Sequence, residues 1–357
     1  EKNGGGLYVY GGSLTLTDTT IGGSAAAYGN TAAAGGGIYL TGVGASGEMK
    51  NNCTISYNKA NGYSSASSQI FPQGAGIYIG TSASFTMKDG SIDHNTSAST
   101  TQTANGGGVF ISGNGFDVVG TQASFTMENG AISNNTAGIS TYAGYGGGVG
   151  VKDGGVFTMT GGAISNNEVF KGSGGGVSVH GVMTMTGGTI EQNRVQNGDD
   201  SNGGGGIFLW YGVSRKPTLK MTGGIIKNNT IHAQGMGKGV RVNSGTTITM
   251  EMSGAAKIDT SDDVYLHNDT VPANSAFITV TGALTNNPAA RLTMRHNALG
   301  AIPGGYNVGR AVVKGTSSYT LTTADVSKFT VTQQQSIPAQ NWEVVKNGNA
   351  GELRKYP

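Results

Sequence analysis

Acidic and histidine side chains occur in a few short clusters of this 357-residue chain, and they are the residues that could carry acid–base chemistry. The clusters are Asp89 with Asp93 and His94, Asp117, Asp199 and Asp200 near Glu191, and Asp262 and Asp263 with His267 and Asp269. A pair of carboxylates in a groove could cleave a glycosidic bond. None of the clusters lies in a recognisable catalytic motif, so we assign no catalytic residue. A glycoside hydrolase or polysaccharide lyase remains the alternative hypothesis.

Metal, phosphate and cofactor sites are not expected from the spacing of the candidate ligands. "NGDDSN" holds Asp199 and Asp200 but lacks the spacing of a calcium loop. No histidine or cysteine cluster has metal-ligand spacing, and Cys53, the single cysteine, cannot form a disulfide within the chain. The glycine runs precede strand-like segments instead of opening helices, so they do not predict a phosphate-binding loop. We therefore expect no metal and no cofactor.

Aromatic residues recur just after clusters of glycine. They are Tyr8, Tyr10, Tyr39, Tyr78, Phe110, Phe208 and Trp210. Sugars stack on aromatic rings through their apolar C–H faces, so a row of such rings on one outer face predicts a ligand-binding surface. In the alternative interpretation, the rings stack on one another or lie beneath a corner loop.

Threonine forms a second outward series, which raises ice binding as a minor alternative. The series is Thr15, Thr86, Thr126, Thr158, Thr184 and Thr249, with Lys220 interrupting it. A flat threonine array on a β-helix resembles several ice-binding proteins. Charged residues spoil such an array, and threonine is also a common exposed strand residue.

These side chains must be positioned by a repeat that begins at a glycine cluster. The eight starts are Gly4, Gly35, Gly74, Gly106, Gly146, Gly174, Gly204 and Gly237. Each is followed by an apolar–x–apolar triplet, then by a second triplet such as "FTM", then by a short segment around one isoleucine. The second triplet is irregular in the second repeat, which offers mainly Met49, and we take it as Ile248 and Met250 in the eighth. Alternation at period two predicts strands with one buried face.

Three short strands separated by glycine-rich corners predict one coil of a right-handed parallel β-helix. We expect about eight regular coils over residues 1–256, with equivalent side chains such as Val149, Val177 and Ile207 stacked in columns. Eight rungs give a core roughly 38 Å long. Residues 257–357 lose the glycine triplets and are expected to form irregular final coils or a β-rich cap of the same all-β solenoid.

An asparagine lies three residues after the isoleucine in most repeats. These residues are Asn58, Asn95, Asn135, Asn167, Asn193 and Asn229. Their side-chain amides can bond to the backbone at the bend and to the asparagine of the next coil. We interpret them as a structural turn ladder.

The segments "GGGVFIS…SFTMENGAISNNTA" and "GGGVGVKDGGVFTMTGGAISNNEV" resemble the repeats of large bacterial surface proteins, notably of spirochaetes and gut bacteria. "DDVYL…FITVTGALT" resembles the region that often follows such repeats. The design is also similar to the chlamydial polymorphic outer-membrane proteins, which repeat GGA(I/L/V) and FxxN, although here isoleucine replaces the phenylalanine. The resemblance covers about residues 1–285 and implies an exported, surface-displayed β-helix that is adhesive or structural.

Composition narrows the possible partners. Glycine supplies 64 residues, charged residues make up 12%, and the net charge is +2, which argues against nucleic-acid binding driven by bulk charge. No apolar run approaches the length of a transmembrane segment. We expect an extracellular or cell-surface adhesin, stalk or filament subunit whose leader is not in this chain. The chain opens inside a repeat, so a preceding segment or a second copy, packed head to tail, should cover Leu7–Tyr10.

Overall fold

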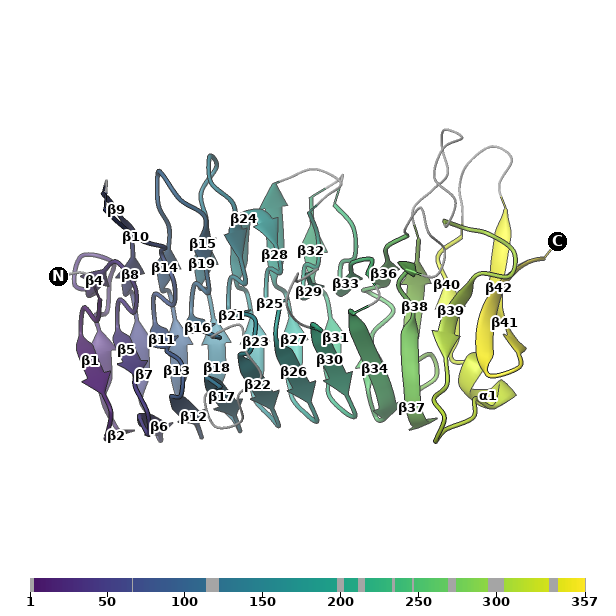
Figure 1. Ribbon diagram of the computed structural model, residues 1–357, viewed down its shortest axis with the longest axis horizontal. Helices are drawn as coiled ribbons and strands as arrows, with labels where there is room; N and C mark the ends of the chain where they lie inside the picture. Colours follow the sequence, from purple (N-terminus) through teal and green to yellow (C-terminus); the bar gives the residue numbers. More distant parts are fainter. Residues whose placement is uncertain are drawn as a thin grey trace.

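The computed structural model describes residues 3–65, 67–113, 122–197, 202–210, 216–232, 235–245, 247–268, 274–294, 305–333 and 340–356. Short strands follow one another in successive coils along a rod, with the two chain termini at opposite ends (Figure 1). Strands of neighbouring coils pair in parallel through most of the rod. The predicted parallel β-helix is confirmed.

Two long sheets run the length of the rod. Sheet 1 contains, in spatial order, β1 (Leu7–Tyr10), β5 (Ile38–Thr41), β11 (Ile77–Ile79), β16 (Val109–Ile111), β21 (Val149–Val151), β25 (Val177–Val179), β29 (Ile207–Leu209), β33 (Val240–Val242), β36 (Val264–Leu266), β38 (Ala290–Thr293) and β40 (Phe329–Val331). Sheet 2 contains β2 (Ser13–Thr17), β6 (Ser46–Lys50), β12 (Ser84–Met87), β17 (Ser124–Met127), β22 (Val156–Met159), β26 (Val182–Met185), β30 (Thr218–Met221), β34 (Thr249–Gly254), β37 (Ile278–Leu284), β39 (Ala311–Lys314), β42 (Ala350–Tyr356) and β41 (Asn341–Asn347).

Two further sheets close the coils. Sheet 3 holds the isoleucine segments: β3 (Thr20–Gly22), β7 (Thr54–Ser56), β13 (Ser91–Asp93), β18 (Ala131–Ser133), β23 (Ala163–Ser165), β27 (Thr189–Glu191), β31 (Ile225–Lys227) and β35 (Lys257–Ile258). Sheet 4 was not predicted: β4 (Thr31–Ala32), β8 (Lys59–Ala60), β14 (Thr96–Ser97), β19 (Thr136–Ala137), β24 (Glu168–Ser173), β28 (Arg194–Asn197) and β32 (Thr230–Ile231), with β15 (Ala104–Asn105) and β20 (Gly144–Tyr145) joining it through β24. β9 (Tyr63–Ser65) and β10 (Ser68–Ile70) pair as a separate antiparallel hairpin.

Equivalent side chains superpose from coil to coil. Val149 pairs in register with Val177, and Val177 pairs with Ile207. The phenylalanine–methionine and isoleucine columns of sheets 2 and 3 are likewise in register. All of these inward residues are buried in one continuous core. Each coil is therefore buried by its neighbours, as expected for a solenoid.

Two details of the second strand differ from the expectation. In β6, Gly47 occupies the position where neighbouring coils carry Leu14 and Phe85, and a side chain built on Gly47 would meet the Phe85 ring. The large ring thus fills the room that the glycine leaves. In β34 the buried pair is Met250 and Met252, in register with Leu219 and Met221. The predicted pair, Ile248 and Met250, was wrong by two residues. A shift of two residues keeps the same alternation of buried and exposed positions, so the alternation could not reveal it.

The glycine triplet that opens each coil is required by close packing between coils. Gly174 has a φ of +72°, a conformation that side chains other than glycine rarely adopt. The next two glycines face the neighbouring coil. A Cβ on Gly148 would lie 2.8 Å from the carbonyl oxygen of Gly176 and 3.0 Å from Nδ2 of Asn167. Any side chain there would push the coils apart.

The last coils lead into a different kind of structure. Sheet 1 continues through β36, β38 and β40. In sheet 2, β42 pairs antiparallel with β39, and β41 pairs antiparallel with β42. A short helix, α1 (Thr323–Val326), starts at a capping box in which Thr322 and Asp325 bond reciprocally. The C-terminal end of the rod is thus covered by an antiparallel hairpin and a helical turn (Figure 1).

Candidate functional site

The outward residues of sheet 1 form a column of aromatic rings over the first four coils. Tyr8 stacks on Tyr39 with ring centroids 5.3 Å apart, and Tyr39 stacks on Tyr78 at 4.3 Å, both pairs within 3° of parallel. Tyr78 stacks on Phe110 at 5.6 Å. Each inner ring is therefore covered on both faces by its neighbours. The column is a self-stacking ladder, and its ring faces are open to a ligand only where the stack is interrupted.

Exposure along the predicted aromatic row varies widely. Tyr8 and Tyr10 are 55% and 76% exposed, whereas Phe110 and Phe208 are only 3% and 1% exposed. Tyr39 and Tyr78 are partly buried, and burial together with the adjacent tyrosines raises the pKa of Tyr39 above its usual range. An outward direction in this sheet does not imply contact with water.

Phe208 belongs to a second group of rings and lies three coils beyond Phe110. The Arg241 guanidinium lies between the rings of Phe208 and Tyr265, 5.7 and 5.6 Å from their centroids. Such cation–π contacts stabilise a buried cation. Beside this group, Trp210 stacks on His180 at 5.5 Å and 4° and meets Phe208 edge-on.

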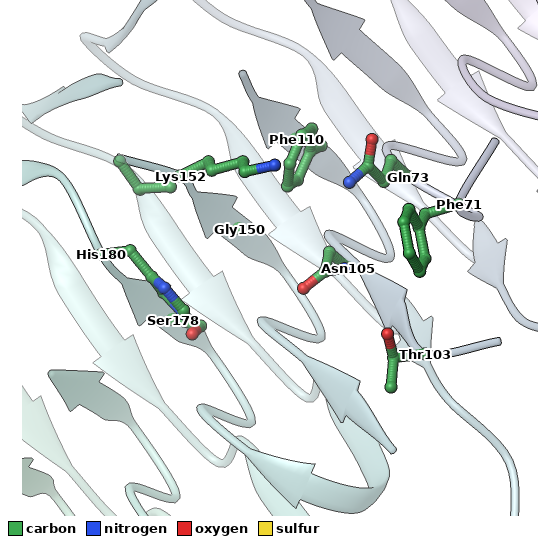
Figure 2. Close-up of a pocket in the computed structure, with 10 residues that line it drawn as sticks. Phe71, Gln73, Thr103, Asn105, Phe110, Gly150, Lys152, Ser178 and His180 are labelled. Carbon is green, nitrogen blue, oxygen red and sulfur yellow. The ribbon is translucent and has the colours of Figure 1, made fainter. Parts of the chain in front are cut away.

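Between the two groups of rings the column is interrupted by Gly150 and Ser178. Register places Gly150 next to Phe110, and Ser178 between Gly150 and Phe208. The interruption opens a hollow of about 190 Å³. It is lined by Phe71, Gln73, Thr103, Asn105, Phe110, Gly150, Val151, Lys152, Ser178 and His180. Figure 2 shows Phe110 and His180 on opposite sides of Gly150.

The electrostatic character of this hollow is nearly neutral. Lys152 is the single charged side chain among the lining residues that the structure describes. Burial, with a smaller contribution from the nearby charge of Lys152, lowers the pKa of His180 to about 4. His180 is therefore a neutral imidazole at neutral pH, able to donate one hydrogen bond and accept one.

The asparagines form a hydrogen-bonded ladder inside the bend that follows sheet 3. In each rung the backbone N–H and Nδ2 of one asparagine donate to Oδ1 of the next, as Asn135 does to Asn167 at 3.0 and 2.9 Å. Nδ2 also donates to an isoleucine carbonyl, Ile92 in the case of Asn135. The other rungs, Asn58, Asn95, Asn167, Asn193 and Asn229, repeat this pattern. These side chains hold the turns together and are closed to solvent.

The ladder extends at both ends beyond the predicted residues. Asn30 starts it, donating from its backbone and side chain to Oδ1 of Asn58. Asp262 ends it, accepting from the backbone N–H and Nδ2 of Asn229 at 2.9 and 2.7 Å. Asn30 was missed because it lies nine residues after Ile21, not three. The signal that could have found it is "NTA", which recurs at 135–137.

The acidic candidates in this part of the described chain are each held by a separate local partner. Asp262 is fully buried in the ladder, and burial raises its pKa to about 6. Asp263 accepts a hydrogen bond from the backbone N–H of Lys238 at 2.6 Å. Oδ2 of Asp93 lies 2.9 Å from Nδ1 of His94.

The remaining acidic candidates bond to a nearby residue or lie outside the residues that the structure describes. Asp89 bonds the adjacent Gly90 N–H, and Glu191 pairs with Lys227 at 3.3 Å. His267 is buried in part. Asp117, Asp199, Asp200 and Asp269 lie outside the described residues, and with them the "NGDDSN" segment.

The outward threonine row of sheet 2 is interrupted by charge more often than its sequence suggested. Glu48 lies between Thr15 and Thr86. At the other end, Lys220 pairs in register with Glu251, and the two side chains form a 3.8 Å ion pair. Thr249 pairs with Thr218 and so lies outside the row. Its inclusion was wrong for the same reason as the Ile248 pair. The row is not a uniform threonine array.

Comparison with protein-family models, with curated proteins and with solved structures found no match to this chain. None of the described residues forms a helix long and apolar enough to cross a bilayer. Within the same described ranges, no three His, Cys, Asp or Glu side chains are grouped to hold a metal ion. The candidate site is the outer face of sheet 1, where the aromatic column and its hollow lie.

Proposed function

We propose that the chain is a non-catalytic β-helical rod of an exported or cell-surface protein, which presents the outer face of sheet 1 to a glycan of a host or neighbouring cell. It serves as an adhesin or stalk. The sequence resemblance to bacterial surface repeats agrees with this proposal, and so does the regular rod, since a solenoid offers a long rigid face for contact.

The observation that carries the proposal is the interrupted aromatic column with its nearly neutral hollow. Aromatic rings beside amide and hydroxyl groups are suited to sugars, whose rings have apolar faces and polar edges. Cleavage of a glycosidic bond in most hydrolases needs two carboxyl groups on either side of that bond. The described residues that line the hollow include no carboxylate, which favours binding over hydrolysis.

A glycan array combined with a reducing-sugar assay tests this function. We expect the protein to retain particular glycans on the array and to release no reducing ends from the same glycans in solution. Release of reducing ends that increases with protein concentration and time would replace the binding proposal with the carbohydrate-active enzyme. Retention of no glycan would contradict the proposal altogether.

We also propose that a second copy of the chain packs head to tail against the first coil. β1 is the edge strand of sheet 1, and uncovered edges invite pairing. At the other end of the rod, β41 is the edge strand of sheet 2. It carries Glu343 and Lys346, charges that discourage such pairing. Light scattering across a concentration series tests the second copy: mass should rise with concentration, and a constant monomer mass would rule that copy out.

A further inference from the structure

We propose that the interruption of the aromatic column at Gly150 and Ser178 is a binding subsite for a single sugar ring. This inference deepens the proposed function, on which it rests, by assigning glycan binding to one hollow instead of to the aromatic row as a whole. The exposed rings at the start of the row, Tyr8 and Tyr10, are then not required.

The shape of the interruption suits a single ring. Three coil steps separate Phe110 from Phe208, which is about 14 Å at the usual spacing of strands. Gly150 contributes no side chain to this interval and Ser178 a small one. The 190 Å³ hollow that results lies between the Phe71 and Phe110 rings on one side and His180 on the other (Figure 2). The column supplies no ring of its own at these two positions.

An unpartnered polar group, the Ser178 hydroxyl, lies at the hollow. Ser178 is 1% exposed, and its hydroxyl has no hydrogen-bond partner among the described residues. Buried hydroxyl groups in native proteins are nearly always hydrogen-bonded, so a group without a partner calls for an explanation. Ser178 lines the hollow, and a ligand there that carries hydroxyl groups would supply the missing bond.

The side chains that form the walls of the hollow are polar and uncharged for the most part. Hydrogen bonds from the side chains of Gln73 and Asn105 to other described residues are absent, which leaves two amides able to donate and accept. His180 is neutral at neutral pH and is held in place by its stack on Trp210. Rings, amides, a hydroxyl and a neutral imidazole together match a pyranose, which has apolar C–H faces and hydroxyl edges.

Fluorescence titration tests the subsite, because Trp210 stacks directly on His180. The probes are methyl glycosides of glucose, galactose, mannose and N-acetylglucosamine, and any oligosaccharide retained on the array. We expect at least one probe to change the tryptophan emission saturably. Ser178→Phe should fill the hollow with a ring next to Phe208 and weaken binding at least tenfold. Thr184→Phe, which adds the same ring to sheet 2 of the same coil, should bind as wild type does.

The outcomes separate this inference from the proposed function. If Ser178→Phe binds glycan as tightly as wild type, the subsite is overturned while the proposed glycan binding stands. Loss of glycan binding in a Tyr8→Ala, Tyr10→Ala double variant would then place the binding site at the start of the aromatic row. No binding of any probe or array glycan would overturn both. If Ser178→Phe does not give the wild-type circular dichroism spectrum, Ser178→Ala decides instead: it should weaken binding several-fold, and unchanged affinity would contradict the subsite.

Discussion

Asp262 occupies the position at which the preceding coils carry asparagine. Its side chain is fully buried and accepts two hydrogen bonds from Asn229. Burial nevertheless raises the pKa of Asp262 to about 6, since the low-dielectric interior disfavours the charged form more than the two bonds favour it. The folded protein therefore holds a proton on this carboxyl more tightly than the unfolded chain does. Stability supplied by Asp262 is complete below pH 3.8 and is lost as the pH rises through 6.

Asp262→Asn is expected to stabilise the protein above pH 6. The amide can accept the same two bonds, and it can donate to the Ile226 carbonyl as Asn229 does to Ile190. The gain at pH 8 should be on the order of 3 kcal/mol, from a pKa difference of about two units, and it should shrink towards pH 4. Urea unfolding at the two pH values measures it.

Asp259→Asn is the matched control, because Asp259 lies in the same turn and Lys257 lowers its pKa. The effect of pH on stability has the opposite sign for Asp259. Its contribution to stability is present above its unfolded pKa and is lost on acidification. Asp259→Asn should therefore weaken the protein slightly at pH 8. A loss of stability at pH 8 in Asp262→Asn would show that the carboxylate itself is needed at the end of the ladder.

The residue just before each ladder asparagine from Asn58 to Asn229 has a left-handed backbone. Asn134, Asn166 and Asn228 have φ of 55–56°, a conformation that asparagine tolerates, but Gln192 occupies the same site with φ of 56°. Gln192→Asn should raise the free energy of unfolding by about 0.5 kcal/mol. The reverse change, Asn166→Gln, should lower it by a similar amount. Paired urea midpoints check both, and an equal sign for the two changes would contradict the argument.

At this scale the sequence predicted the interior of the ladder but not its ends. The asparagines from Asn58 to Asn229 follow an isoleucine at constant spacing, so their shared role could be inferred. Asn30 follows a longer insertion, and Asp262 is a different residue type within an acidic cluster that suggested chemistry. The role of a residue at the end of the ladder depends on its hydrogen-bond partner, and sequence spacing does not identify that partner.

The asparagine ladder acts as a single element because each rung supplies the acceptor for the rung before it. Asn135→Ala should leave the backbone N–H and Nδ2 of Asn95 without their acceptor. Two buried unsatisfied donors cost about 1–3 kcal/mol each, so we expect a loss of about 3–5 kcal/mol in chemical denaturation.

Asn30→Ala is the control for this change, since no asparagine among the described residues donates to Asn30. It removes one side-chain donor, Nδ2, at the partly buried end of the ladder and orphans no donor of another rung, so its cost should be about 1 kcal/mol. Equal costs for the two variants would show that the rungs act independently of their position.

Elements were predictable in proportion to their length and periodicity. The columns through Val149, Phe125 and Ile132 could be inferred because alternation and repetition agree. Sheet 4 could not, because strands of two residues such as Thr136–Ala137 are too short to display alternation. The burial of Phe110 and Phe208 could not be predicted from the sequence either. It depends on what neighbouring coils and loops lay over an outward position.

The whole molecule is a stack in which each coil contacts mainly its neighbours, so one coil should be removable at equivalent positions. Ser173 and Gly203 are bridged partners in adjacent coils. Deleting residues 174–203 joins Ser173 to Gly204, which is the bond that Gly203 makes in the next coil, and it brings β21 next to β29 and Asn167 next to Asn229. The shortened protein should keep its β-sheet circular dichroism and lose about 5 Å of length in small-angle scattering.

Deleting residues 174–188 is the contrasting change, because it removes half a coil and places sheet 3 residues where sheet 1 residues belong. That chain should not form a soluble rod. Recovery of a folded rod from the half-coil deletion, or collapse of the full-coil deletion, would contradict the stacked arrangement.

The hydrogen bonds between neighbouring side chains of the ladder all point one way, and this polarity has a consequence for length. Every asparagine donates to the side-chain oxygen of the next rung, so the series can continue until it reaches a side chain that only accepts. Asp262 is such a side chain, and it ends the ladder. Longer or shorter versions of this rod are therefore expected to differ in how many asparagine rungs come before that aspartate, while the aspartate itself stays at the final position.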